Sequence, residues 1–183
     1  MFSKATAALA AALCAATLGA GPVAASGKER VVGPYWNPHT KSYFALIDTT
    51  ETGLRWSQAA KLATTRHYKG AQGRLAVIPD RQTHDFIMEK FGRAFNDDAW
   101  IGLRYFCAFR KLMWVNGEEL SHNPVGVWHV QWFRDHSTTC STTGGMQYMP
   151  VYYRHMGVGA TWQASGEIKR FYDYLIEYPT GKQ

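Results

Sequence analysis

The sequence predicts one α+β domain that follows a cleavable leader. Two segments with the apolar spacing of helices lie in the first half of the chain, and apolar, aromatic runs typical of strands lie on both sides of them. The 183 residues suit a single domain, and too few residues are charged (19%) and too many are aromatic for a disordered chain. Aromatic residues make up 14%, so rings fill the core, form a binding surface, or do both.

The leader, residues 1–25, has the order of a secretory signal peptide. Lys4 supplies a positive charge, residues 5–18 are apolar and uncharged, and Val23-Ala24-Ala25 offers small residues for cleavage after Ala25. The apolar run is shorter than the roughly 20 residues that span a bilayer. We therefore expect a mature chain, 26–183, that is secreted or periplasmic and does not span a membrane; a retained N-terminal anchor is the alternative.

The mature domain is predicted to open with a β-hairpin and a helix. Two apolar, aromatic runs at 31–36 and 42–48 flank residues 37–40, whose Asn-Pro-His-Thr composition is typical of a turn. In 56–63, one tryptophan and three alanines then fall at i, i+3, i+4 and i+7. That spacing places them on one face of a helix.

A short buried strand and a second helix come next. Residues 75–78 are continuously apolar and stop at a proline, which indicates the strand. Asp80 is a good N-cap for the helix because its carboxylate accepts from free backbone N–H groups. Ile87 and Phe91 share a face of this helix, and Gly92 is expected to end it.

The second half of the chain is predicted to contain strands and a long loop. Strand-like runs occupy 100–104, 112–115, 148–154 and 171–178. Between them, 121–145 has no clear period and is rich in His, Thr, Ser and Gly. A long irregular segment in a compact domain is usually functional or disordered.

Five motifs in this order resemble the C-type lectin-like domain. They are Trp56-x-x-Ala59-x-x-x-Ala63, Gly73-Arg74-Leu75-Ala76-Val77-Ile78, Trp100-Ile101-Gly102-Leu103, Trp114-Val115-Asn116-Gly117 and Tyr174-Leu175-Ile176-Glu177-Tyr178. The third is the most specific to that family, and together they cover roughly 31–179. The resemblance implies two helices packed on antiparallel sheets, paired terminal strands, a long loop, and a core that contains Trp100, Ile101 and Leu103.

The sequence lacks the calcium cage of the sugar-binding members of that family. Those members carry a Glu-Pro-Asn or Gln-Pro-Asp triplet in the long loop and an Asn-Asp pair after a later tryptophan, which supply the oxygen ligands that calcium requires. This chain has Trp132-Phe133-Arg134-Asp135-His136 and Trp162-Gln163-Ala164-Ser165 at the corresponding places. We therefore expect no metal and no cofactor at this site.

The cysteines also differ from the family pattern. Ala63 and Ile176 stand where the resemblance implies a disulfide between the first helix and the last strand, so apolar packing is expected to replace that bond. Cleavage of the leader removes Cys14 and leaves Cys107 and Cys140. An exported compartment is often oxidising, and two cysteines are an even number, so we expect one bond that ties the long loop to the core. Two separate thiols are the alternative.

Side chains in and beside the long loop are the ligand-binding candidates. Aromatic rings stack on sugar faces and anchor protein interfaces, while the charged side chains among them would supply orienting hydrogen bonds. The alternative for each ring is that it packs the loop onto the sheet. The candidates are Trp128, Trp132, Arg134, Asp135, His136 and Tyr152.

Other function classes find little support in the sequence. The basic residues are scattered, whereas nucleic-acid binding usually needs a clustered basic face. Glu118 and Glu119 are adjacent, so they point to opposite faces of a strand and cannot flank one glycosidic bond. His122, His129 and His136, with Cys140 close behind, match no zinc signature.

The sequence thus predicts a non-enzymatic recognition module for a glycan or protein ligand, and no nucleic-acid partner. A structural subunit of a larger exported or membrane-bound complex is the alternative. An enzyme assembled from scattered residues is the third interpretation.

Overall fold

The computed structural model describes residues 28–120, 128, 148–156 and 160–183. The described part of the chain contains the predicted helices and strands in their predicted order, with three further strands that the sequence did not predict. The elements are β1 (Arg30–Asn37), β2 (Ser42–Asp48), α1 (Trp56–Thr65), β3 (His67–Tyr68), β4 (Ala71–Gln72), β5 (Arg74–Leu75), α2 (Arg81–Phe91), β6 (Ala99–Phe106), β7 (Lys111–Trp114), β8 (Tyr148–His155), β9 (Ala160–Ala164) and β10 (Asp173–Tyr178). The three strands that were not predicted are β3, β4 and β9.

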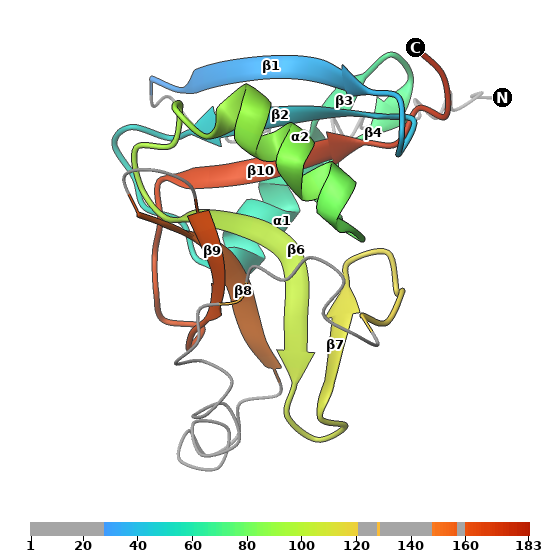
Figure 1. The fold of residues 1–183 in the computed structure, drawn as a ribbon. Helices are drawn as coiled ribbons and strands as arrows, with labels where there is room; N and C mark the ends of the chain where they lie inside the picture. Colours follow the sequence, from blue (N-terminus) through green and yellow to red (C-terminus); the bar gives the residue numbers. More distant parts are fainter. Residues whose placement is uncertain (1–27, 121–127, 129–147, 157–159) are drawn as a thin grey trace, which may run out of the picture.

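One bent sheet organises the molecule. Its strand order is β1-β2-β10-β6-β8-β9, with β5 beside β10 and β7 beside β6. In Figure 1, β1, β2 and β10 run across the top, β7, β8 and β9 lie below them, and β6 bends from one group toward the other. The α+β class is confirmed, but the sheet is mixed rather than antiparallel throughout, because β10 pairs with β6 in parallel.

The predicted hairpin is confirmed, and the last strand closes the fold beside it. β1 and β2 pair antiparallel. β10 pairs with β2, from Asp173 opposite Asp48 to Tyr178 opposite Tyr43. The last strand, β10, therefore pairs with β2, the second strand of the hairpin, rather than with the first strand, β1. β1 forms the edge of the sheet.

The core lies on both faces of the sheet. Every residue of β2 is buried; Phe44 and Leu46 pack in one apolar cluster with residues of α2, while Ala45 and Ile47 pack in the other with residues of α1. Successive side chains of a strand point to opposite faces, so a strand with a helix on each face is apolar at nearly every position. This explains why β2 shows no polar alternation.

The ends of α2 lie where the sequence places them. Asp80 Oδ1 accepts hydrogen bonds from the backbone N and the hydroxyl of Thr83, both at 2.8 Å. Gly92 follows the last helical residue, and its N–H donates to Met88 O at 3.0 Å. The N-cap and the glycine stop are both confirmed.

The strand predicted at 75–78 is right only at its start. β5 ends at Leu75, and Ala76 then bridges two other segments: its N–H donates to Leu175 O, and its carbonyl accepts from Gly102 N, both at 2.9 Å. A Cβ on Gly102 would lie 2.7 Å from Leu75 O. The close backbone packing expected at this glycine is therefore confirmed.

The hallmark strand fills the core as the resemblance implies. Trp100, Ile101 and Leu103 of β6 are fully buried. The indole N–H of Trp100 donates to Leu54 O at 2.7 Å, so its polar atom is satisfied. Ala63 and Ile176 are also fully buried and pack in one cluster, in place of a covalent bond.

Candidate functional site

Two of the predicted ligand contacts lie in the core. Tyr152 is 1% exposed, and its ring centroid lies 4.6 Å from that of Phe171 and 5.8 Å from that of Trp100. Trp128 is 7% exposed and stands edge-on to Trp162 at 5.4 Å. Neither ring offers an open face to a ligand, so packing explains both residues and we retain neither as a candidate.

The other predicted site residues lie outside the described residues. These are Trp132, Arg134, Asp135, His136 and Cys140, and their roles stay predictions. Except for Trp128, the long loop at 121–145, with its histidines, also lies outside the described residues. Cys107 follows β6, is partly buried, and packs against the core cluster that contains α2. Its bond to Cys140 stays a prediction.

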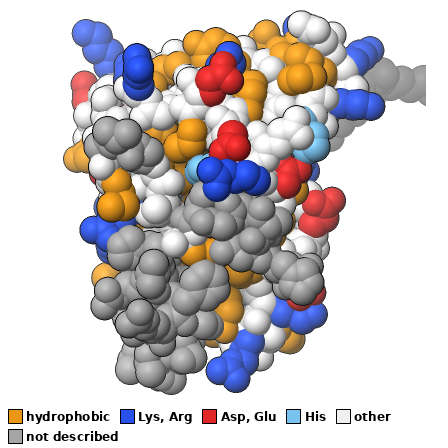
Figure 2. Space-filling view, in the orientation of Figure 1, with side chains coloured by type: hydrophobic (Ala, Val, Ile, Leu, Met, Phe, Trp, Pro, Cys, Tyr) orange, Lys and Arg blue, Asp and Glu red, His pale blue; other side chains and the backbone are white. Residues whose placement is uncertain are grey.

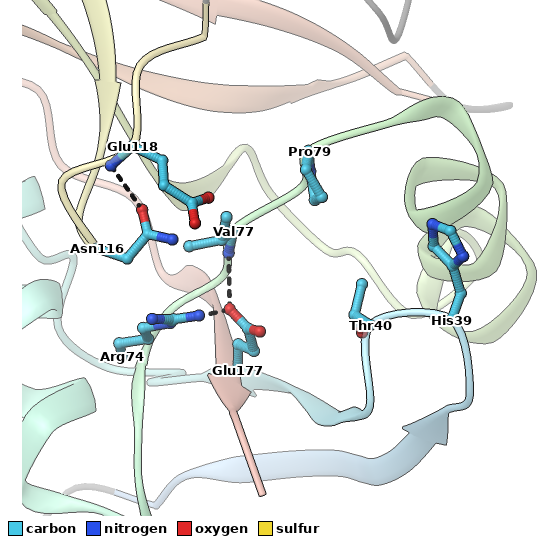
Figure 3. Close-up of a pocket in the computed structure, with 8 residues that line it drawn as sticks. All are labelled: His39, Thr40, Arg74, Val77, Pro79, Asn116, Glu118 and Glu177. Atoms are coloured by element: carbon cyan, nitrogen blue, oxygen red, sulfur yellow. Dashed lines mark hydrogen bonds and ion pairs between the residues drawn. The ribbon is translucent and has the colours of Figure 1, made fainter. Parts of the chain in front are cut away.

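A polar hollow of about 240 Å³ lies among the described residues (Figure 3). Four segments line it: the turn between β1 and β2, the segment from β5 to the start of α2, the turn after β7, and β10 (Figure 3). These segments meet only because β10 lies between β2 and β6 in the sheet. The hollow is thus a product of the topology rather than of any local motif.

An ion pair between buried Glu177 and half-buried Arg74 forms the floor of this hollow. Glu177 is 3% exposed, and its Oε1 accepts from the Ser42 hydroxyl at 2.7 Å. Its Oε2 accepts from Arg74 Nε at 3.0 Å and from Val77 N at 3.2 Å. Three donors and an opposite charge compensate the desolvation of the carboxylate. Glu177 therefore fixes both Arg74 and the backbone at Val77.

The turn after β7 forms one wall. Gly117 has a φ of +89°, which glycine adopts without strain, and Asn116 Oδ1 accepts from Glu118 N at 3.1 Å. Glu119 pairs with Lys111 at 2.8 Å, whereas Glu118 lines the hollow and has no ion pair among the described residues. The interpretation of these glutamates as flanks of an exposed turn is confirmed.

The opposite rim joins the β1–β2 turn to α2. His39 Nε2 lies 2.6 Å from Asp80 Oδ2. Burial raises the pKa of Asp80, but the hydrogen bonds from His39 and Thr83 outweigh it and hold the pKa below its ordinary value. Asp80 is therefore ionised at neutral pH, and it both caps α2 and holds the turn.

A second hollow, of about 450 Å³, lies near the other end of β10, where Asp48, Asn96 and Asp97 help to line it. Asp173 is fully buried, and its Oδ2 accepts from the backbone N of Asn96 at 2.8 Å and of Asp97 at 3.2 Å. Its Oδ1 has no hydrogen-bond partner among the described residues. Burial, with a smaller contribution from Asp48, raises the pKa of Asp173 to about 6.

On the described part of the face in Figure 2, neither charge sign predominates. Figure 2 shows Lys and Arg side chains interspersed with Asp and Glu side chains over the described part of one face. Within the described residues, no three His, Cys, Asp or Glu side chains come together as a metal site. No helix in the described part of the chain is long and apolar enough to cross a membrane.

Solved structures share this arrangement of helices and strands. CEL-I, a C-type lectin from Cucumaria echinata, matches with a TM-score of 0.53 and 13% identity, over 74% of this chain and 89% of that chain. The chain has the C-type lectin-like fold. The cow C-type carbohydrate-recognition domain of CD23 also matches, with a TM-score of 0.52 and 20% identity, over 75% of this chain and 87% of that chain.

A third C-type lectin-like match is EMS16, with a TM-score of 0.50 and 15% identity, over 79% of this chain and 97% of that chain. No protein-family model and no curated protein sequence matches the chain. At sequence identities of 13% to 20%, the likeness to these structures shows the fold alone. The likeness lies in the three-dimensional structure and not in the sequence. The resemblance inferred from the sequence motifs is thereby confirmed at the level of the fold.

The residues of the polar hollow were missed by sequence reasoning. Arg74 and Glu177 stand within motifs of the C-type lectin-like resemblance, where they were quoted only as scaffold. They are 103 positions apart in the chain, and no local pattern links them. The only local signal was the Asn116-Gly117 turn.

Proposed function

We propose that the chain is an exported, non-enzymatic recognition module that binds a glycan or a protein surface through its long loop, without the calcium cage. The supporting observation is the C-type lectin-like fold of the described residues, joined to a loop sequence that lacks the calcium ligands. Structures with this fold include CD23, solved in the presence of the oligosaccharide GlcNAc2Man3. They also include EMS16, an antagonist of the collagen receptor integrin α2β1.

The burial of the described tryptophans narrows the choice of contact residues. Trp100, Trp114 and Trp162 are among the largest fully buried side chains of the described structure, so they serve the scaffold. We assign ligand contact to Trp132, because an indole ring stacks on a sugar face or anchors a protein interface. Arg134, Asp135 and His136 are the assigned hydrogen-bonding groups beside it.

A Cys107–Cys140 bond belongs to the same proposal. Cys107 packs against the core, so a bond to it would tie the loop to a fixed point. Closing a loop of this length stabilises by about 3–4 kcal/mol in the loop-entropy model. Mass measurement after thiol labelling of the unreduced protein tests the bond: no label on Cys107 or Cys140 is expected, and two labels per mature chain would refute it.

A glycan array, run once with calcium and once with EDTA, tests the recognition proposal. The expected result is binding that EDTA leaves unchanged, that Trp132→Ala abolishes and that Phe109→Ala retains. Phe109 is a matched control because its ring is 70% exposed and lies in the β6–β7 turn. Loss of all binding in EDTA would contradict the proposal, and co-purification at fixed stoichiometry with an envelope protein would favour the structural-subunit alternative.

A further inference from the structure

The polar hollow of Figure 3 is a second candidate site, built from described residues. Its described lining residues come from the four segments named above. Figure 3 shows Asn116 and Glu118 on one side of it and His39 and Thr40 on the other. The volume of about 240 Å³ is below the roughly 300–1,000 Å³ typical of pockets for drug-sized ligands. The space therefore suits one small unit.

The floor presents fixed hydrogen-bond donors. Arg74 uses its Nε on Glu177, and its two terminal nitrogens have no hydrogen-bond partner among the described residues. A guanidinium keeps its donors in a rigid plane. Because Glu177 holds one edge of that plane, the remaining donors are positioned before any ligand arrives. The charge of Arg74 is at the same time offset by that of Glu177.

The wall adds one more donor and an acceptor. Asn116 Oδ1 is occupied by the N–H of Glu118, so the free group of this amide is its Nδ2 donor. The Glu118 carboxylate only accepts, and it has no ion pair among the described residues. Thr40 supplies a further unsatisfied group, because its hydroxyl oxygen is buried without a hydrogen-bond partner in the described structure.

This combination selects the chemical class of the ligand. The offset of Arg74 by Glu177 leaves the Glu118 charge uncompensated, which disfavours anions. The Arg74 and Asn116 donors need an acceptor, which an ammonium ion does not offer. Hydroxyl groups both donate and accept, and Val77 and Pro79 supply apolar lining. We infer that the hollow binds one neutral sugar unit: Arg74 and Asn116 donate to its hydroxyl oxygens, and Glu118 accepts from its hydroxyl groups. This site does not depend on the loop proposed above.

Titration of the ¹⁵N-labelled protein, followed by its amide NMR signals, tests the inference. Neutral hexoses and N-acetylhexosamines are the probes, in the millimolar range of weak single-unit binding, with inorganic phosphate and methylammonium as charged comparisons. The amide signals of Val77, Asn116 and Glu118 are expected to shift with at least one neutral sugar, and less with either ion.

Matched variants distinguish a built site from general surface effects. Glu118→Gln is expected to weaken the sugar roughly tenfold, since a hydrogen bond to a charged group is lost. Glu119→Gln, on the same exposed turn but paired with Lys111, is expected to leave the affinity unchanged. Trp132→Ala is expected to leave these shifts intact, so failure of the loop proposal and failure of this one are separable. Absence of shifts with every sugar, a larger response to either ion, or equal weakening by both glutamine variants would overturn the inference.

Discussion

β10 buries one carboxylate near each end, and the two are stabilised in different ways. Glu177 accepts three hydrogen bonds, one of them from the guanidinium of Arg74. Asp173 accepts only two backbone N–H groups on Oδ2, and its Oδ1 has no partner among the described residues. Arg30, the cation that lowers the pKa of Asp173, pairs instead with Asp48 at 3.4 Å.

The difference shows what each end of the strand does. At Glu177 the fold supplies a counter-charge, and the carboxylate in turn orders an arginine at an open polar hollow. At Asp173 the carboxylate ties β10 to the backbone at residues 96–97 and carries a raised pKa, about 6, chiefly because of burial. A buried acid that organises its neighbours is a feature of a binding site; one that lacks a counter-charge weakens the fold when it ionises.

Removal of the Glu177 carboxylate should give the largest effect. Glu177→Ala leaves Ser42, Val77 N and the half-buried Arg74 without their acceptor, and the loss of one partner of a buried pair costs about 3–5 kcal/mol. Urea unfolding at pH 7 measures this cost. Glu118→Ala, on an exposed turn, is the control and should change the free energy of unfolding by less than about 0.5 kcal/mol. A loss below about 1 kcal/mol for Glu177→Ala would show that the ion pair does not organise this end.

Asp173→Asn should act in the opposite direction. The pKa of Asp173 lies above its unfolded value of 3.8, so the ionised form destabilises the fold at pH 7. An asparagine keeps an acceptor for the two backbone N–H groups and removes the charge. We expect a gain of about 1–2 kcal/mol at pH 7, which disappears near pH 4. A clear loss at pH 7 in urea unfolding would mean that the charge is needed there.

The sequence predicted the features of this fold that depend on neighbouring residues and missed those that depend on residues far apart in the chain. The hairpin, the cap at Asp80 and the hallmark strand each depend on neighbouring residues, and all were found. The parallel pairing of β10 with β6 and the Arg74–Glu177 pair depend on residues far apart in the chain, for which one sequence carries no signal. β8 is buried on both faces, since its adjacent residues Tyr152 and Tyr153 are each 1% exposed. The alternation of side chains along this strand could therefore not distinguish a ligand contact from a ring in the core.

The pH dependence of the free energy of unfolding should distinguish the effect of Asp173 from that of His84, a second buried titratable group. Burial, with a smaller effect of Arg81, lowers the pKa of His84 from 6.5 to about 4. The fold therefore loses stability at His84 as pH falls from 6.5 toward 4, and at Asp173 as pH rises from 3.8 toward 6.

These two slopes offset one another in the unmodified protein. In Asp173→Asn the His84 slope outweighs the weaker opposing slope of Asp98, whose pKa burial also raises. The free energy of unfolding should therefore rise by about 1–2 kcal/mol between pH 4 and pH 6.5. Urea unfolding across that range provides the measurement. A flat profile in the variant would show that one of the two pKa shifts is misassigned.

Arg30→Gln should give the smallest effect. The Arg30 side chain is 42% exposed and its pair with Asp48 is long, so its loss should cost less than about 1 kcal/mol. Arg30 also lowers the pKa of Asp173 slightly, and the variant should raise that pKa further, as followed by carboxyl NMR titration. A rise in the Asp173 pKa of more than about 1 would contradict the claim that this end lacks an effective counter-charge, because Arg30 would then be that counter-charge.

The most direct test applies one acid-to-amide change to each end of β10. Glu177→Gln and Asp173→Asn are compared at pH 7 by urea unfolding and by the sugar titration of the polar hollow. The Glu177 variant is predicted to lose stability and the sugar-induced shifts of Val77 and Asn116, while the Asp173 variant retains the shifts and loses no stability. Equal losses in both variants, or a greater loss at Asp173, would contradict the claim that Glu177 organises a binding site.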